Sequence, residues 1–441
     1  MFKSLYLSSR FFVVMACCIA GFMLCFSFPS LFLGMLIGMG GLFTFFIIDI
    51  ISIYQLRKGI NSIRNCPAKL SNGDFNPVSF SVTSYYSFQV KIKIVEEIPF
   101  QFQKTDMIFE TSINSGETKT FHYDLRPTER GEYMFGNINV FVSGVLGFFE
   151  RRYILDNKAN VAVYPAFLEM RRYELLAASH RLTDYGVKHI RRIGHSTEFD
   201  QIKQYVMGDD PRTINYKASA RVNQLMVNTY QDEKSQPVYC LIDKGRTMKM
   251  PFNGMTLLDY AINATLMLVN TALNKGDKVG LITFSNTMDR VIPADKNRKQ
   301  RNVILEALYA QETNFKESDY ERLYITLRRN VVQRSLIVLF TNFETINGIN
   351  RQLKFLNRLA KDHLVLVSFF RNSEFDEILD SHPDDMFHIF RKGMAEKLSI
   401  DKQLIVKELN RRGIQTILSR PEELTIDSIN KYLEIKSRNL I

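Results

Sequence analysis

Tryptophan is absent from this 441-residue sequence, and only five cysteines are present. Three of them, Cys17, Cys18 and Cys25, lie in one apolar stretch, whereas Cys66 and Cys240 are isolated. No pair of cysteines has the spacing of a disulfide framework or of a zinc site. The cysteines therefore indicate no covalent cross-link, which agrees with a cytoplasmic location.

The sequence also lacks the signatures of several large enzyme classes. It has no G-x-x-x-x-G-K-[ST] phosphate loop, no G-x-G-x-x-G at a strand end, no H-E-x-x-H and no G-x-S-x-G. His195 and Ser196 are a conceivable base and nucleophile, but adjacent residues rarely face each other in that way, and a surface loop explains them better. We therefore expect no catalytic residues.

Charged side chains are missing from residues 11–48, which contain no Asp, Glu, Lys, Arg or His. One helix of that length would rise about 57 Å at about 1.5 Å per residue, nearly twice the roughly 30 Å apolar core of a bilayer. Pro29 and Ser30 lie at the middle of the run. We predict two transmembrane spans, residues 11–28 and 31–48, joined by a tight turn.

A cleaved signal peptide is the alternative for this apolar run. Lys3 and Arg10 form a suitable basic start, but no A-x-A-like cleavage site follows, and a second span does. The stretch from Val14 to Cys17 faintly resembles a lipoprotein cleavage box, yet the residues after Cys17 stay apolar. The transmembrane hairpin therefore fits better.

Basic residues flank the predicted hairpin on both sides, whereas its turn carries no charge. By the positive-inside rule, both termini and the following soluble part face the cytoplasm, at an inner membrane. The net charge of +11 fits apposition to an anionic leaflet, because each basic residue near the surface contributes about 1 kcal/mol. Nucleic-acid binding is the other interpretation, but no known binding motif is present and the basic residues are scattered, so we expect none. The flanking residues are Lys3, Arg10, Arg57, Lys58, Arg64 and Lys69.

Three segments follow the hairpin, which with a juxtamembrane helix occupies residues 1–65. Apolar and polar residues alternate between about 77 and 164, so residues 66–165 are predicted to form a small antiparallel β-sandwich. From Pro237 onward strands and helices alternate, and apolar runs such as "SLIVLF" are typical of central parallel strands. We predict a doubly wound α/β domain over residues 236–441, with a connector at 166–235. Ligands of such sheets bind at the carboxyl ends of the strands, which directs attention to the loops after Ile242, Phe284 and Phe340.

The loop "LIDKGRTM" after the first of these strands is a candidate cation site. Asp243, Gly245 and Thr247 lie two residues apart, and oxygen ligands in one turn suit a hard cation such as Mg²⁺. The loop resembles the D-x-S-x-S metal-ion-dependent adhesion site of von Willebrand factor A domains. That resemblance implies Thr313 and Asn342 as ligands from two further loops.

The sequence departs from that family pattern at two ligand positions. Gly245 stands where the family has a Ser, and Asn342 stands where it has an Asp. The second change removes a negative charge, so we expect weak Mg²⁺ affinity at most, strengthened by Asn342→Asp. The alternative is that Asp243 caps the following helix and binds no metal.

The segment "STEFDQIKQYVMGDDPRTINYKASAR", residues 196–221, resembles the signature of the bacterial family known as domain of unknown function 58. Its pattern runs approximately E-F-D-x-[IL]-[RK]-x-Y, G-D-D-x-R-x-I and W-K-x-S-A-R, with R-P-x-x-R-G-x-Y upstream. Tyr216 replaces the usual Trp, and Ser143-Gly144-Val145 replace an upstream Asp-Pro. The resemblance implies an N-terminal membrane hairpin and, as partners, a MoxR-type AAA+ ATPase and other von Willebrand A proteins.

The connector itself is predicted to be a short amphipathic helix over residues 199–206, followed by a Gly-Asp-Asp-Pro turn. Its charged residues suggest an interdomain clamp, and the alternatives are a partner-docking surface or a catalytic site. In a clamp, the aspartates of the turn would pair with the basic residues that follow. The residues concerned are Glu198, Asp200, Asp209, Asp210, Arg212, Lys217 and Arg221.

The sequence thus predicts a multi-domain chain with a transmembrane hairpin, a β-sandwich and a von Willebrand A-like, Rossmann-like α/β domain. By resemblance, it would be a membrane-anchored cytoplasmic interaction or scaffold protein that works with the ATPase in envelope complex assembly or stress response. The alternative is a metal-assisted hydrolase that uses Asp243, Thr247 and Thr313 around Mg²⁺. Asn342 counts against it, because the third carboxylate is missing.

Overall fold

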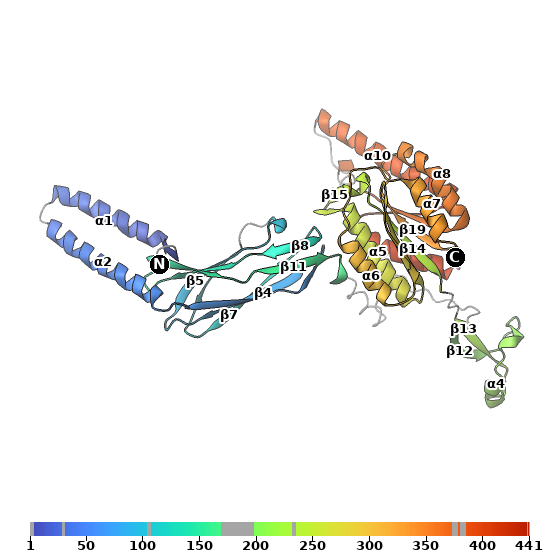
Figure 1. The fold of residues 1–441 in the computed structure, drawn as a ribbon, viewed down its shortest axis with the longest axis horizontal. Helices are drawn as coiled ribbons and strands as arrows, with labels where there is room; N and C mark the ends of the chain where they lie inside the picture. The colour runs from blue at the N-terminus through green and yellow to red at the C-terminus, as the bar shows by residue number, and fades with distance from the viewer. Residues whose placement is uncertain are drawn as a thin grey trace. The chain divides into compact units, whose positions relative to one another are not determined.

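The computed structural model describes residues 4–28, 31–103, 107–168, 198–231, 235–372, 378–379, 385–438 and 440. The chain divides into two compact units, Met1–Tyr164 and Pro165–Ile441. Figure 1 shows the elements that make up each unit.

Two apolar helices begin the first unit. Helix α1 spans Ser9–Ser27, α2 spans Phe32–Tyr54, and the two lie side by side, with Phe11 and Phe46 in ring contact (Figure 1). Among the described residues, α2 is the one helix long and apolar enough to cross a membrane. An N-terminal helix of this kind is compatible with a membrane anchor or with a signal sequence.

Asp49 ties the end of α2 to the β-sheet that follows. Its buried carboxylate accepts hydrogen bonds from the backbone N–H groups of Leu146 at 2.8 Å, Phe148 at 2.9 Å and Phe149 at 3.1 Å. A Cβ atom at Gly144 would overlap this carboxylate. The glycine that departs from the family's Asp-Pro therefore makes room for Asp49.

The rest of the first unit consists of three sheets with antiparallel pairing throughout, apart from the parallel pair β3–β11. The strands alternate buried and exposed side chains, and Phe80, Ile94 and Tyr133 are among the residues of the common core. The prediction of antiparallel sheets is thus confirmed. In sheet order, the strands are β1 (Leu5–Leu7), β10 (Phe149–Leu155), β9 (Ile138–Ser143), β5 (Val90–Glu96) and β6 (Met107–Ile113); β2 (Ile60–Asn65), β4 (Asn76–Ser84) and β7 (Thr118–Leu125); and β3 (Lys69–Ser71), β11 (Ala159–Tyr164) and β8 (Gly131–Phe135).

Arg64 is not the surface charge that its place in the sequence indicated. Its guanidinium donates to the Glu96 carboxylate at 2.9 Å, and both side chains are buried. Arg57 and Lys58, by contrast, are exposed just after α2. These two residues, rather than Arg64, place positive charge at the surface near the end of the apolar helix.

The second unit is built on a six-stranded sheet in the order β18-β17-β14-β19-β20-β21. Neighbouring strands are parallel, apart from β18, which is antiparallel to β17. The predicted α/β region is confirmed at this level. The strands are β14 (Pro237–Asp243), β17 (Lys278–Phe284), β18 (Met288–Asp295), β19 (Leu336–Phe340), β20 (Leu364–Phe370) and β21 (Gln415–Ser419).

Helices cover both faces of this sheet (Figure 1), so its central strands are buried on both sides. Cys240, in the middle of β14, is fully buried, and this burial raises the pKa of its thiol to about 12. One core contains residues of α5, α6 and α11, and the other contains residues of α7, α8 and α10. The helices are α5 (Leu257–Asn274), α6 (Lys299–Tyr309), α7 (Tyr320–Asn330), α8 (Ile346–Asp362), α10 (Met386–Arg411) and α11 (Leu424–Ser437).

Local sequence signals fix the ends of α5. Thr256 and Asp259 form a reciprocal capping box at its start, next to the short hairpin of β15 (Pro251–Phe252) and β16 (Met255–Thr256). Just beyond the C-terminal end of the helix, Gly276 has a positive φ of 78°, which favours glycine. Gly276 therefore marks the point at which the chain leaves α5.

The connector differs from its prediction. Residues 199–206 were expected to be helical, but β12 (Glu198–Gln204) pairs antiparallel with β13 (Met226–Gln231). Between these strands lie the 3-10 turn Pro211–Thr213 and the helix α4 (Tyr216–Val222). An isolated helix of two turns is marginal in water, whereas the hairpin satisfies the backbone of both strands.

Candidate functional site

The carboxyl edge of the six-stranded sheet collects the polar side chains of the predicted site. β14 ends at Asp243, and its parallel neighbour β19 ends at Phe340, so Thr341 and Asn342 emerge beside Asp243. The loop before α7 brings Ser318 to the same edge. From β14 the sheet continues to β17 on one side and to β19 on the other. Doubly wound sheets bind ligands at such a switch in strand order.

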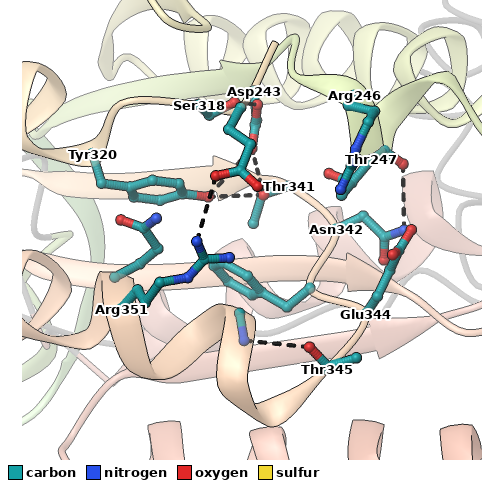
Figure 2. Close-up of a pocket in the computed structure, with 14 residues that line it drawn as sticks. Asp243, Arg246, Thr247, Ser318, Tyr320, Thr341, Asn342, Glu344, Thr345 and Arg351 are labelled. Atoms are coloured by element: carbon teal, nitrogen blue, oxygen red, sulfur yellow. Dashed lines mark hydrogen bonds and ion pairs between the residues drawn. The ribbon is translucent and has the colours of Figure 1, made fainter. Parts of the chain in front are cut away.

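Asp243 is the centre of this arrangement, and only 3% of its surface is exposed. One carboxylate oxygen accepts from the Gly245 N–H at 2.8 Å and from the Ser318 hydroxyl. The other accepts from the hydroxyls of Thr341 at 2.7 Å and Tyr320 at 3.3 Å (Figure 2). Burial raises the pKa of Asp243 despite these four bonds. Asp243 therefore organises the loops around it and keeps no free oxygen of its own.

Ser318 accounts for the first departure from the adhesion-site pattern. A Cβ atom at Gly245 would overlap the Ser318 hydroxyl and approach the nearest Asp243 oxygen to 3.0 Å. A serine at position 245 would thus displace the Ser318 side chain. The hydroxyl missing from position 245 is supplied from the loop before α7.

Asn342 is hydrogen-bonded to a lysine of the protein. Its side-chain oxygen accepts from the Lys402 ammonium at 2.6 Å, and its amide nitrogen donates to the Thr247 carbonyl at 3.4 Å. Lys402 belongs to α10, and burial lowers the pKa of its ammonium to about 8, although the charge of Glu344 acts in the opposite direction. The position that carries a metal-ligating Asp in the family thus bonds to a cationic side chain here.

The predicted ligand residues are only partly brought together. Asp243, Thr247 and Asn342 line one cavity of about 140 Å³, whereas Thr313 is not among its lining residues. The sequence interpretation missed Ser318, Tyr320 and Thr341. Of these three, Thr341 could have been found from the sequence, because it is a hydroxyl residue directly before Asn342 and therefore lies at the same strand end.

These residues do not fit a divalent cation. Both Asp243 oxygens are engaged by donors, and Lys402 engages the Asn342 oxygen. The lining holds Arg246 and Arg351 as well as Glu317 and Glu344, and Arg351 pairs with Glu317 at 3.6 Å. Among the described residues, no group of three or more His, Cys, Asp or Glu side chains is placed to hold a metal. The alternative, in which Asp243 caps the following helix, is not met either: the 3-10 helix Arg246–Lys249 has Gly245 as its N-cap and no side-chain cap bond. The bond from the Gly245 N–H to Asp243 instead stabilises the turn before that helix.

The two aspartates of the connector have separate roles. Asp209 accepts from the Lys203 ammonium at 2.9 Å and from the Val206 N–H at 3.0 Å, and both bonds lower its pKa. Asp210 accepts from the backbone N–H of Arg212 at 3.0 Å and caps the 3-10 turn. The prediction that these acids pair with basic side chains downstream is not met. Lys203, upstream, is the partner instead.

The other charged residues of the connector do not form the ion pairs that were predicted for a clamp. Within the described residues, the side chains of Arg212, Lys217 and Arg221 bond to neither aspartate. The side chains of Glu198 and Asp200 lie outside the described part of the structure.

Several large side chains of the connector are exposed. The exposed fraction is 97% for Met207, 75% for Tyr216 and 56% for Val222. Asn215, which the sequence interpretation missed, holds this region together by capping α4 at the Ala218 N–H and by donating to Asn228. Apolar and basic side chains are therefore displayed on the segment between β12 and β13, which includes α4.

Comparison with known proteins relates the central part of the chain to one family. Residues 201–376 match a family described as "Protein of unknown function DUF58". The "Uncharacterized protein YeaD" of Bacillus subtilis (strain 168) is 25% identical over 167 residues, which cover 37% of this chain and 39% of that protein. The match thus spans about two fifths of this relative. The family resemblance found in the sequence is confirmed for this segment, which includes Asp243, Asn342 and the second half of the connector.

Two solved structures show weak likeness. The conserved hypothetical protein BatB from Bacteroides thetaiotaomicron is 15% identical, with 46% of this chain and 99% of that chain covered and a TM-score of 0.30. A CARDB domain from Pyrococcus furiosus is 16% identical, with 24% and 86% covered and a TM-score of 0.18. Likeness this weak supports no conclusion about function.

Proposed function

We propose that the protein is a membrane-anchored interaction protein that docks a partner through the connector. The observation that supports it most is the display of exposed apolar and basic side chains on the β12–β13 hairpin. We name this set the connector surface. It consists of Met207, Arg212, Tyr216, Lys217, Arg221 and Val222.

The composition of the connector surface favours docking over clamping. Tyr, Met and Arg are enriched in the centres of protein interfaces, and Tyr and Arg are frequent hot spots. A clamp of the predicted kind would pair the aspartates of the turn with the basic residues that follow, but Asp209 is already paired with Lys203. The unneutralised basic residues suit a partner with an acidic patch.

The remaining parts of the proposal rest on the sequence patterns. The apolar helix Phe32–Tyr54, with α1 beside it, supports a transmembrane hairpin and cytoplasmic soluble units at the inner membrane. The strand order around β14 and the Asp243 loop supports a von Willebrand A-like domain. Family resemblance supports a MoxR-type AAA+ ATPase as the partner. A metal-assisted hydrolase has no comparable support, because both Asp243 oxygens are engaged.

The proposal is tested on the full chain in membranes. We expect Tyr216→Ser combined with Arg221→Glu to weaken binding of the purified ATPase from the same genome at least about tenfold, with unchanged thermal stability. Phe100→Ser is the matched control, since Phe100 is an aromatic residue with 85% exposure in the first unit. Chemical crosslinking and titration measure the binding.

Two results would contradict docking. The double variant could bind as the parent does, or it could lose thermal stability together with binding, which would return the connector to the clamp interpretation.

A further inference from the structure

A second cavity lies next to the Asp243 site, at the same edge of the sheet. It has a volume of about 220 Å³ and is bounded by the β15–β16 hairpin, the end of β20 and helix α10. Most of its wall is apolar and includes Phe252, Leu257, Phe370 and Leu398. Asn342 lines both cavities. We name this second space the Lys402 cavity.

Lys402 contributes a positive charge to this mostly apolar space. Its ammonium donates to the neutral side-chain oxygen of Asn342 at 2.6 Å. No carboxylate in the described part of the chain lies within ion-pair distance of it, and Glu344 acts on it only at longer range. The ammonium also lies 5.6 Å from the centre of the Phe369 ring. Buried charges are ordinarily paired with an opposite charge, so an ammonium held by an amide and an aromatic ring is incompletely compensated.

We propose that the Lys402 cavity binds an organic carboxylate carried on a short apolar body. The carboxylate would accept from the Lys402 ammonium, and the apolar body would pack against Phe252, Leu257 and Leu398. Pockets for drug-sized ligands measure about 300–1,000 Å³, so a cavity of about 220 Å³ suits one apolar group with its acid.

The charges around the cavity also define the charge of the ligand. Lys402 carries one positive charge, its hydrogen-bond partner Asn342 is neutral, and Glu344 lines the cavity on the negative side. A single ammonium suits a monoanion better than a phosphate ester or a dicarboxylate, because a second negative charge on the ligand would face Glu344. Both a free short-chain acid and the C-terminus of a peptide that ends in an apolar residue have this chemistry.

This inference is independent of the connector surface. It involves residues of β15, β20 and α10, and none of those that are proposed to dock a partner. Failure of one proposal would leave the other intact.

The test uses the full chain in lipid nanodiscs and two probe pairs. Hexanoate represents free acids, and N-acetyl-leucine represents a peptide C-terminus, while hexanamide and N-acetyl-leucinamide are their neutral controls. We expect at least one acid to bind about tenfold or more tightly than its amide, as measured by saturation-transfer NMR and titration. Preference for one acid identifies the source of the ligand.

Two variants of the cavity and one control variant test whether the acid binds there. Lys402→Met should remove the preference for acid over amide, whereas Lys397→Met, an exposed lysine of the same helix, should keep it. Leu398→Phe should weaken binding of the preferred acid while the ammonium remains, which covers the case in which Lys402→Met fails to fold. Equal affinity for acid and amide, no binding below about 10 mM, or unchanged binding in a folded Lys402→Met protein would overturn the proposal.

Discussion

The contact between Asn342 and Lys402 changes the expected effect of Asn342→Asp on Mg²⁺ binding. From the sequence alone, Asn342→Asp adds a metal ligand and should strengthen Mg²⁺ binding. In the structure, the Lys402 ammonium lies 2.6 Å from the Asn342 oxygen, so the new carboxylate would form an ion pair with it. At 4 Å and an effective dielectric constant of 20, such an attraction is about 4 kcal/mol before desolvation.

We therefore predict that Asn342→Asp alone does not increase Mg²⁺ affinity. The double variant Asn342→Asp/Lys402→Met should bind Mg²⁺ more tightly than either single variant, because its carboxylate has no internal cation. Calorimetry on the parent and the three variants measures this. Strong binding by the parent that is lost in Asp243→Ala would show that the Asp243 carboxylate does release its donors for a metal.

Part of this site was predictable from the sequence and part was not. Asp243 and Asn342 follow apolar runs of strand type, and the carboxyl ends of such strands meet at one edge. Ser318 and Lys402 contact them across 75 and 60 residues of sequence, and no local pattern marks either contact. Such contacts depend on how the loop before α7 and the helix α10 pack against the sheet.

At the scale of elements, Asp49 shows how an apolar helix is joined to a sheet. Its carboxylate is the acceptor for three backbone N–H groups of the β9–β10 loop. Without it, these groups would lose their acceptor in a buried place, and each unsatisfied group costs about 1–3 kcal/mol.

We expect Asp49→Ala to lower the melting temperature of the first unit by several degrees, about 4–8 °C per kcal/mol for a small domain. Asp49→Asn should be intermediate, because it keeps one acceptor oxygen. Glu110→Ala is the control, since Glu110 is an exposed carboxylate of β6. Gly144→Ala should cause a loss that is not additive with Asp49→Ala, because it disturbs the same contact. Unchanged melting of Asp49→Ala would mean that the loop does not depend on the carboxylate.

Element types were predictable where the hydrophobic pattern was long. The strands of the α/β region and the end of α5 follow from apolar runs, a capping pair and Gly276. The connector was predicted wrongly, because Phe199, Ile202 and Val206 also fit a helical spacing over so short a window. Residues 198–204 form a strand because they pair with β13, whose residues lie 22 or more positions later in the sequence. A window of eight residues does not include this pairing partner.

At the scale of the whole molecule, orientation in the membrane is the first question. Arg57 and Lys58 are exposed after α2, and Lys3 and Arg10 precede the second apolar helix. By the positive-inside rule, positive charge on both sides of the apolar segment predicts that both ends lie in the cytoplasm.

We predict that a reporter active only outside the cytoplasm is active when fused after Ser30 and inactive when fused after Ile441. A cytoplasmic reporter should give the reverse pattern at the two positions. If the C-terminal fusion is active outside the cytoplasm, the soluble units lie on the other side. If the N-terminal segment is cleaved, the apolar helices act as a signal sequence.

The buried Cys240 has a consequence for the kinetics of the intact protein. A thiol in the middle of β14, with a pKa of about 12, presents almost no thiolate to solvent while the sheet is closed. Its alkylation therefore proceeds only through openings of the α/β unit, and the rate counts those openings. The other four cysteines all belong to the first unit, so peptide mapping separates their labels. The alkylation rate of Cys240 thus reports how often the α/β unit opens in the intact chain, without denaturant and without removal of the apolar helices.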